Sequence, residues 1–519
     1  MPGWRDFPAR GGRAMRGSLA LLRRAAPPLD LPILGRVLLH SALVGVVAGL
    51  LGAAFFASLE VAQRFLLSGL AGYTPARAVG ETFLAEGTGR APRLWMLALL
   101  PGAGGLASGL LTTFLAPEAS GGGGDAVIHA YHRGGRVRRR VLWLKWAAAL
   151  FTLSSGGSGG REGPTMQIGG AIGALVGRVL PTTRRERRIL LVAGIAAGIS
   201  AVFRTPLGAA LLATELLYRD DFEAEALVPA IFASVVAYSV VIALYGETTL
   251  FGRLPPFPFV PAHLPLYALL ALAVAAAAAV FVRTLAAAQR LSARLPVPRW
   301  TRPALGGLAM GALGAAVAWR LAARYGPEAA RVGVFGGGYG VAQAAIAGSS
   351  ALPRGWELVA LLAGLCLAKL VASALTIGSG GAAGDFAPSL VIGGLLGGAF
   401  GHAAALLFHD PRLAPGAFAL VGMGTFYGGI AHAPLAALVL VAELAGSYDL
   451  LVPMMLAVAV ALVALRSLTL YPAQPENKAD APLERRVSRW SGASHHPLPR
   501  LRPRRRAPSS PVPAGGEER

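Results

Sequence analysis

The feature that most constrains this chain is a series of apolar stretches, only some of which are long enough to cross a lipid bilayer. Hydrophobic residues make up 54% of the 519 residues and charged residues 14%, a balance that a water-soluble domain does not tolerate. Roughly sixteen apolar stretches follow one another between residues 38 and 470. A hydrocarbon core about 30 Å thick requires about 20 helical residues, yet stretches such as 123–132 and 141–153 are much shorter.

Short apolar stretches have to stop inside the membrane or pair end to end. Non-helical backbone at that depth persists only where protein buries it or where it lines a polar cavity. The sequence therefore predicts an all-α polytopic membrane protein, built as a bundle of broken helices. The single cysteine, Cys366, excludes a disulfide framework and a cysteine-based metal site. His129, His132 and His432 form no convincing ligand set, so we expect no metal and no cofactor.

Positive charge is concentrated at the two ends of the chain, which carries a formal net charge of +22. By the positive-inside rule we expect both termini to be cytoplasmic. We interpret residues 1–37 as a basic N-terminal segment and 476–519 as a disordered basic tail. A nucleic-acid partner is not expected, because the tails lack interleaved aromatic residues and a folded binding module. The first residues show no cleavable signal pattern.

Two landmarks recur along the chain and indicate an internal duplication. Pro206-Leu207 and Pro434-Leu435 each begin an apolar helix that carries a glutamate nine residues later, Glu215 and Glu443. A Gly-rich break precedes each of these helices, and its two copies lie 224 residues apart. Paired Gly/Pro-interrupted segments in two halves indicate a binding site near the midplane. We therefore divide the membrane part into repeats 38–249 and 250–475, each with about eight helices.

Three breaks, at 120–125, 156–164 and 378–388, place Gly-rich backbone directly before a helix. The free amides and partial positive charge of a helix N-terminus attract anions, so three converging ends would favour a small anion. Asp125 and Asp385 begin helices, and we expect them to act as N-caps. Intramembrane carboxylates are often functional, but the matched positions of Glu215 and Glu443 favour structural pairing. A nucleotide site is not expected, because 156–165 lacks the Gly-Lys-Ser/Thr ending of a P-loop.

At these residues the sequence resembles the CLC family of chloride channels and proton-coupled chloride exchangers. The resemblance rests on Gly160-Arg161-Glu162-Gly163-Pro164, on Gly384-Asp385-Phe386-Ala387-Pro388, and on Tyr471 after the last apolar stretch. It implies a CLC-type bundle with two inverted-topology repeats, in a homodimer with one pore per subunit. It also implies an integral protein of the plasma (inner) membrane, surrounded by lipid.

The same resemblance implies roles for individual residues. Glu162 would be the gating glutamate, whose carboxylate can occupy an anion position and swing away when protonated. The central anion would be held by the amides of Asp385 and Phe386 and by the Tyr471 hydroxyl. The complete set that we expect to bind the anion is Gly122, Gly123, Arg161, Gly163, Asp385, Phe386, Ala387 and Tyr471.

Two departures from the family pattern affect the expected function. Gly122 stands where the family motif G-S-G-I-P has a serine, and Leu216 stands where exchangers have a proton-relay glutamate. Because leucine cannot titrate, we favour passive conduction of chloride or a similar anion, gated by protonation of Glu162. The alternative is chloride/proton exchange with a non-standard proton path through the adjacent Glu215 or through water near Gly122.

Two other classes of function compete with anion transport. A membrane-embedded enzyme could use Glu162 as a general base, but no nucleophile–base pair, zinc motif or acid dyad accompanies it. A cation transporter would need carboxylates clustered away from positive helix ends, whereas Glu162 and Asp385 lie at helix starts. We therefore expect a transport protein that is not an enzyme, with small anions and protons as its partners.

Overall fold

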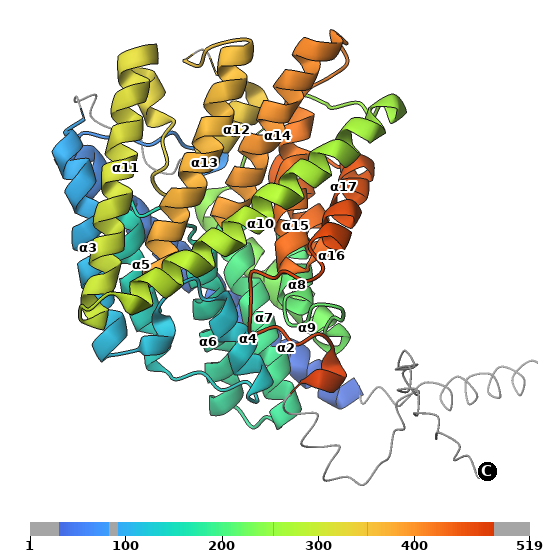
Figure 1. The fold of residues 1–519 in the computed structure, drawn as a ribbon. Helices are drawn as coiled ribbons and strands as arrows, with labels where there is room; N and C mark the ends of the chain where they lie inside the picture. Colours follow the sequence, from blue (N-terminus) through green and yellow to red (C-terminus); the bar gives the residue numbers. More distant parts are fainter. Residues whose placement is uncertain (1–30, 82–91, 253, 350, 482–519) are drawn as a thin grey trace, which may run out of the picture.

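The computed structural model describes residues 31–81, 92–252, 254–349 and 351–481. These residues form a bundle of α-helices joined by irregular segments (Figure 1). Their extended pairing is limited to one isolated antiparallel bridge between Gly160 and Gly384. The expected all-α broken-helix bundle is confirmed. Most of 1–37 and 476–519 lies outside the described residues, although the first described helix already begins at Leu31.

The described helices fall into two series of equal number. The first series is α2 (Leu31–Gln63), α3 (Leu94–Phe114), α4 (Gly124–His132), α5 (Arg140–Ser154), α6 (Glu162–Val179), α7 (Arg184–Phe203), α8 (Pro206–Glu215) and α9 (Ala224–Tyr245). The second is α10 (Leu264–Arg294), α11 (Arg302–Tyr325), α12 (Tyr339–Ala347), α13 (Trp356–Gly378), α14 (Phe386–Phe408), α15 (Pro415–Ala431), α16 (Pro434–Ala445) and α17 (Leu451–Ala464). Short 3-10 or π turns lie at Arg64–Leu70, Val79–Glu81, Pro117–Ala119, Pro261–His263, Arg299–Thr301, Pro327–Arg331 and Lys478–Asp480.

Helix lengths follow the pattern seen in the sequence. Seven helices among the described residues are long and apolar enough to cross a membrane unaided. By contrast α4 and α12 have nine residues each, and α8 and α16 have 10 and 12. Helices of this length cannot span a hydrocarbon core, so their ends lie inside the protein.

The packing of the two series shows that they are related by a two-fold axis. Within the first series α6 packs on α7 and α3 on α5, and the counterparts α14–α15 and α11–α13 pack in the same way. Three helices contact their own counterparts, in the pairs α3–α11, α6–α14 and α8–α16. Contact between an element and its own copy is the mark of a two-fold relation.

Helices α3 and α11 also reveal the direction of the repeat. Ala98, near the start of α3, lies against Gly311 in α11, whereas Gly109, further along α3, lies against Trp300. The counterparts therefore run antiparallel. The two repeats consequently have inverted topology, as the resemblance implied.

The two matched glutamates join the repeats reciprocally. Glu215 at the end of α8 accepts hydrogen bonds from the first two amides of α16, at 3.3 and 2.8 Å. Glu443 in α16 accepts from the first two amides of α8, at 3.1 and 2.8 Å. Helix-start amides have no partner within their own helix, so each repeat supplies the acceptors that the other lacks. The expected structural pairing of Glu215 and Glu443 is confirmed.

Two buried lysines form a second matched pair, which the sequence analysis did not single out. Lys145 on α5 is fully buried, and its Nζ donates to two carbonyls in the segment before α4, at 3.0 and 2.7 Å. Lys369 on α13 is 1% exposed and donates to two carbonyls before α12, at 3.1 and 2.6 Å. Each lysine fixes a Gly-rich segment that leads into a short helix.

Candidate anion site

The three predicted breaks meet at the centre of the molecule. The amide of Gly160 donates to the carbonyl of Gly384 at 2.8 Å, and Gly384 donates back at 2.7 Å. A Cβ atom on Gly163 would overlap the carbonyl oxygen of Gly122 and lie 2.7 Å from Gly384 Cα. Glycine is therefore required by close backbone approach. The starts of α4, α6 and α14 converge here, which confirms the expected convergence.

A fourth break, before α12, joins them and was missed in the sequence. The amide of Gly159 donates to the carbonyl of Gly336 at 3.2 Å. Gly338 is the N-cap of α12 with φ of 91°, and Gly123 is the N-cap of α4 with φ of 97°. Applying the internal repeat to the α4 break would have revealed it. Four helix N-termini thus give this region a positive potential.

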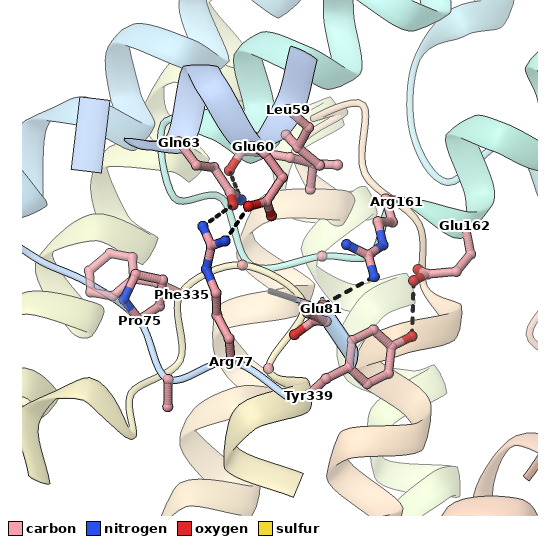
Figure 2. Close-up of a pocket in the computed structure, with 16 residues that line it drawn as sticks. Leu59, Glu60, Gln63, Pro75, Arg77, Glu81, Arg161, Glu162, Phe335 and Tyr339 are labelled. Atoms are coloured by element: carbon pink, nitrogen blue, oxygen red, sulfur yellow. Dashed lines mark hydrogen bonds and ion pairs between the residues drawn. The ribbon is translucent and has the colours of Figure 1, made fainter. Parts of the chain in front are cut away.

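Glu162 is the first residue of α6. Its carboxylate lies where the starts of α4, α6, α12 and α14 converge, a place that we call the crossing. The residue is 1% exposed. Its Oε1 accepts a hydrogen bond of 2.9 Å from the hydroxyl of Tyr339, the first residue of α12 (Figure 2). Its Oε2 has no hydrogen-bond partner and lies where a Cβ on Gly160 would be. One oxygen is thus held while the other is free, an arrangement that suits a carboxylate able to move.

A cavity of about 50 Å³ opens beside Glu162 and is lined by several charged side chains. Figure 2 shows Arg77 directed at Glu60 and Gln63, and Arg161 directed at Glu81. The Arg161–Glu81 ion pair measures 3.2 Å, and the Arg161 guanidinium also lies over the Phe56 ring at 4.6 Å. Arg161 therefore faces the cavity. The space is large enough for water.

Asp385 and Tyr471 form the opposite end of the crossing. The Tyr471 hydroxyl donates to Asp385 Oδ1 at 2.9 Å, and both side chains are buried. The resemblance implied that this hydroxyl faces an anion; here it faces the carboxylate. The Tyr471 ring packs over Gly124, where a Cβ would overlap it. The Tyr427 hydroxyl lies 3.5 Å from that of Tyr471.

The expected N-cap roles of the two aspartates are wrong. Asp385 occupies the N-cap position of α14, but its side chain makes no capping hydrogen bond, because it is engaged by Tyr471. The N-cap of α4 is Gly123, and Asp125 is the second residue of that helix. Asp125 instead accepts a hydrogen bond from the amide of Ala473 at 3.0 Å.

The remaining predicted site residues lie around the same crossing. Gly122 is partly exposed, and a Cβ there would lie 2.9 Å from Asp385 Oδ2. Ala387 is fully buried, and the Phe386 ring packs at 4.4 Å from that of Tyr427.

The expected proton path through Glu215 and Leu216 finds little support in the geometry. Leu216 is fully buried, and its carbonyl accepts from Gln474 Nε2 at 2.8 Å. The Glu215 carboxylate is turned to the amides of α16. The described hydrogen bonds of these two residues therefore go to α16 and Gln474, and not to the residues around the Gly160–Gly384 bridge.

Sequence and structure comparisons agree with this geometry. The family model described as Voltage gated chloride channel matches residues 104–466. The H(+)/Cl(-) exchange transporter ClcA of Salmonella arizonae is 33% identical over 459 residues, which cover 86% of this chain and 87% of that protein. The protein of the same name from Cronobacter sakazakii is 33% identical over 455 residues, covering 86% and 89%.

Solved structures share the fold. A slow cyanobacterial Cl⁻/H⁺ antiporter gives a TM-score of 0.66 at 24% identity and covers 88% of this chain and 99% of its own. A CLC-type fluoride/proton antiporter gives 0.68 at 22% identity, covering 86% and 98%. The expected CLC-type fold with two inverted repeats is therefore confirmed.

Proposed function

The chain belongs to the CLC family of chloride channels and transporters, and from this premise we propose that it exchanges chloride or a similar small anion for protons. The proposal rests mainly on the position and hydrogen bonding of the Glu162 carboxylate. This buried carboxylate has one free oxygen and lies where four helix N-termini converge. Such a position favours any anion, whether a side chain or an ion in solution.

The proposed mechanism is competition between the Glu162 carboxylate and the transported anion. When ionised, the carboxylate is attracted to the helix ends and fills an anion position. When protonated, it loses that attraction, and a small anion takes its place. The cavity lined by Arg161 and Glu81 lies beside Glu162 and is large enough for water, so we place the entry of protons to Glu162 there. The anion can therefore displace the carboxylate only after Glu162 has taken up a proton from water, and this requirement links the two movements.

We propose exchange as the function in place of passive conduction, which the sequence alone favoured. The relatives at 33% identity carry the name H(+)/Cl(-) exchange transporter. Passive conduction remains the second candidate, because Leu216 cannot titrate and Glu215 is bound to α16. We also propose that the protein is a homodimer with one pore per subunit. It would lie in the plasma (inner) membrane with both termini in the cytoplasm.

Proteoliposomes that contain the purified protein test the proposal. An imposed chloride gradient should drive protons uphill, and the reversal potential should deviate from the chloride equilibrium potential. Glu162→Gln should retain anion flux but lose the uphill movement of protons. Glu443→Gln serves as a control, because it changes an intramembrane carboxylate at a distance from the crossing. A reversal potential that follows chloride alone would establish passive conduction instead.

A further inference from the structure

The geometry points to a second gating carboxylate: Asp385 fills the central anion position and has to take up a proton before an anion can enter from the Tyr471 side. This inference rests on the proposed function and deepens it. Glu162 governs one end of the crossing, beside the cavity of Arg161, and Asp385 governs the other.

The position of the Asp385 carboxylate is the first support. Asp385 directly precedes α14, is 7% exposed and makes no capping hydrogen bond to its own helix. Its Oδ1 accepts from the Tyr471 hydroxyl at 2.9 Å, the donor that the family pattern assigns to the anion. The carboxylate thus uses the donor and the helix end that would otherwise serve a bound ion.

The space for this carboxylate is provided by Gly122. A Cβ at that position would lie 2.9 Å from Asp385 Oδ2, closer than a carbon and an oxygen approach without displacement. The serine found here in the family motif would crowd the carboxylate. Glycine at 122 and aspartate at 385 are therefore complementary: the glycine removes the neutral donor of the family motif, and the aspartate puts a negative group beside the vacated position.

Asp385 also matches Glu162 in its surroundings. Each is a buried carboxylate at a helix start, on either side of the Gly160–Gly384 bridge, and each accepts a 2.9 Å hydrogen bond from a tyrosine. Tyr339 is the first residue of α12, and the Tyr471 ring packs on the first residue of its counterpart, α4. The two tyrosine–carboxylate pairs thus occupy comparable places on the two sides of the Gly160–Gly384 bridge.

The charged and titratable groups that face Asp385 are few. Lys145 from α5 attracts its charge and Asp125 from α4 repels it, while Tyr471 and, behind it, Tyr427 from α15 supply hydroxyl groups. The Lys145 ammonium is already bound to two backbone carbonyls. It therefore attracts the aspartate without forming an ion pair that would fix it.

Protons can reach Asp385 from the Tyr471 side. Asp125 is exposed and Gly122 partly exposed, so water approaches Oδ2 along this face. An ionised Asp385 repels an anion at the same helix end, and a protonated one admits it. Entry of an anion is thereby linked to uptake of a proton, a function that Leu216 cannot provide.

Chloride binding to the detergent-solubilised Glu162→Gln protein tests the inference, because this background removes the other carboxylate. Calorimetry between pH 4.5 and 9 should show affinity falling with rising pH, by up to tenfold per unit. Titrations in buffers of different ionisation enthalpy should show up to one proton taken up per chloride. Adding Asp385→Asn should abolish both effects. Adding Asp125→Asn instead, a nearby exposed carboxylate, should preserve the slope.

A pH-independent affinity in Glu162→Gln would overturn the inference, as would an unchanged slope after Asp385→Asn. If Asp385→Asn does not fold, Tyr471→Phe replaces it: loss of a donor to the ionised carboxylate should move the midpoint of chloride binding to higher pH. An unmoved midpoint would count against Asp385. Transport by the parent protein reports separately on the proposed function, since exchange can persist when binding to Glu162→Gln is independent of pH.

Discussion

Replacing Glu215 should reduce the stability of the protein without affecting proton coupling. The carboxylate accepts hydrogen bonds from two amides at the start of α16, at 3.3 and 2.8 Å, and is 7% exposed. Glu215→Leu would leave both amides without an acceptor. Each buried unsatisfied donor costs about 1–3 kcal/mol, so we expect a loss of about 2–4 kcal/mol, allowing for partial relaxation. Glu215→Gln keeps one acceptor oxygen and should cost only about 1 kcal/mol.

The inverted repeat provides a matched control. Glu443 binds the first amides of α8 in the same geometry, at 3.1 and 2.8 Å. Thermal unfolding in detergent can be followed by tryptophan fluorescence at a fixed heating rate. For both glutamates, the melting temperature should fall from the parent to the glutamine variant and again to the leucine variant. Glu443 is less deeply buried than Glu215. Glu443→Leu should therefore lower the melting temperature less than Glu215→Leu does.

Transport measurements then separate a structural role from a proton relay. In proteoliposomes, Glu215→Gln should couple protons to chloride as well as the parent does. If this variant lost proton movement while retaining its melting temperature and chloride flux, the structural interpretation would be refuted. Glu215 would then be the relay beside Leu216.

Three further predictions concern other parts of the molecule. Gly163→Ala should destabilise by about 1–3 kcal/mol through overpacking at the crossing, whereas Gly364→Ala, which meets open space on α13, should leave the melting temperature unchanged. Lys369→Met should lower the melting temperature, because the buried carbonyl of Val334 loses its donor at about 1–3 kcal/mol, while the carbonyl of Gly336 keeps only the amide of Gly159. In the loop after α14, hydrogen bonds from the Arg412 side chain and backbone, and from His263, hold the pKa of Asp410 well below its usual value. Its stabilisation should be complete above about pH 4 and lost on further acidification, and Asp410→Asn should flatten that loss in melting curves taken from pH 3 to 7.

Features that repeat at fixed spacing could be predicted from the sequence. The breaks around Gly160 and Gly384 and the paired glutamates gave the inverted architecture and the convergence of helix ends. The same reasoning, carried further, would have found Lys145 and Lys369, which lie 224 residues apart. It would also have found the fourth break before Tyr339, since α12 is the counterpart of α4.

The partners of individual side chains could not be predicted in this way. Asp385 looked like an N-cap because local spacing is all that a single sequence shows at a helix start. Its partner, Tyr471, lies 86 residues further along, and Tyr339 lies 177 residues from Glu162. Contacts over such separations depend on how the two repeats pack together, which neither propensity nor periodicity encodes.

The reciprocal pairing of Glu443 with α8 has a consequence for how the protein is synthesised. The amide of Leu207 and its acceptor are separated by 236 residues. At the usual translation rate of about 5–20 residues per second, Glu443 is added about 12–47 s after Leu207. During that interval the start of α8 lacks the carboxylate that accepts from its first amides. The nascent first repeat therefore cannot reach its final packing alone, and its closure waits for the second repeat to emerge from the ribosome.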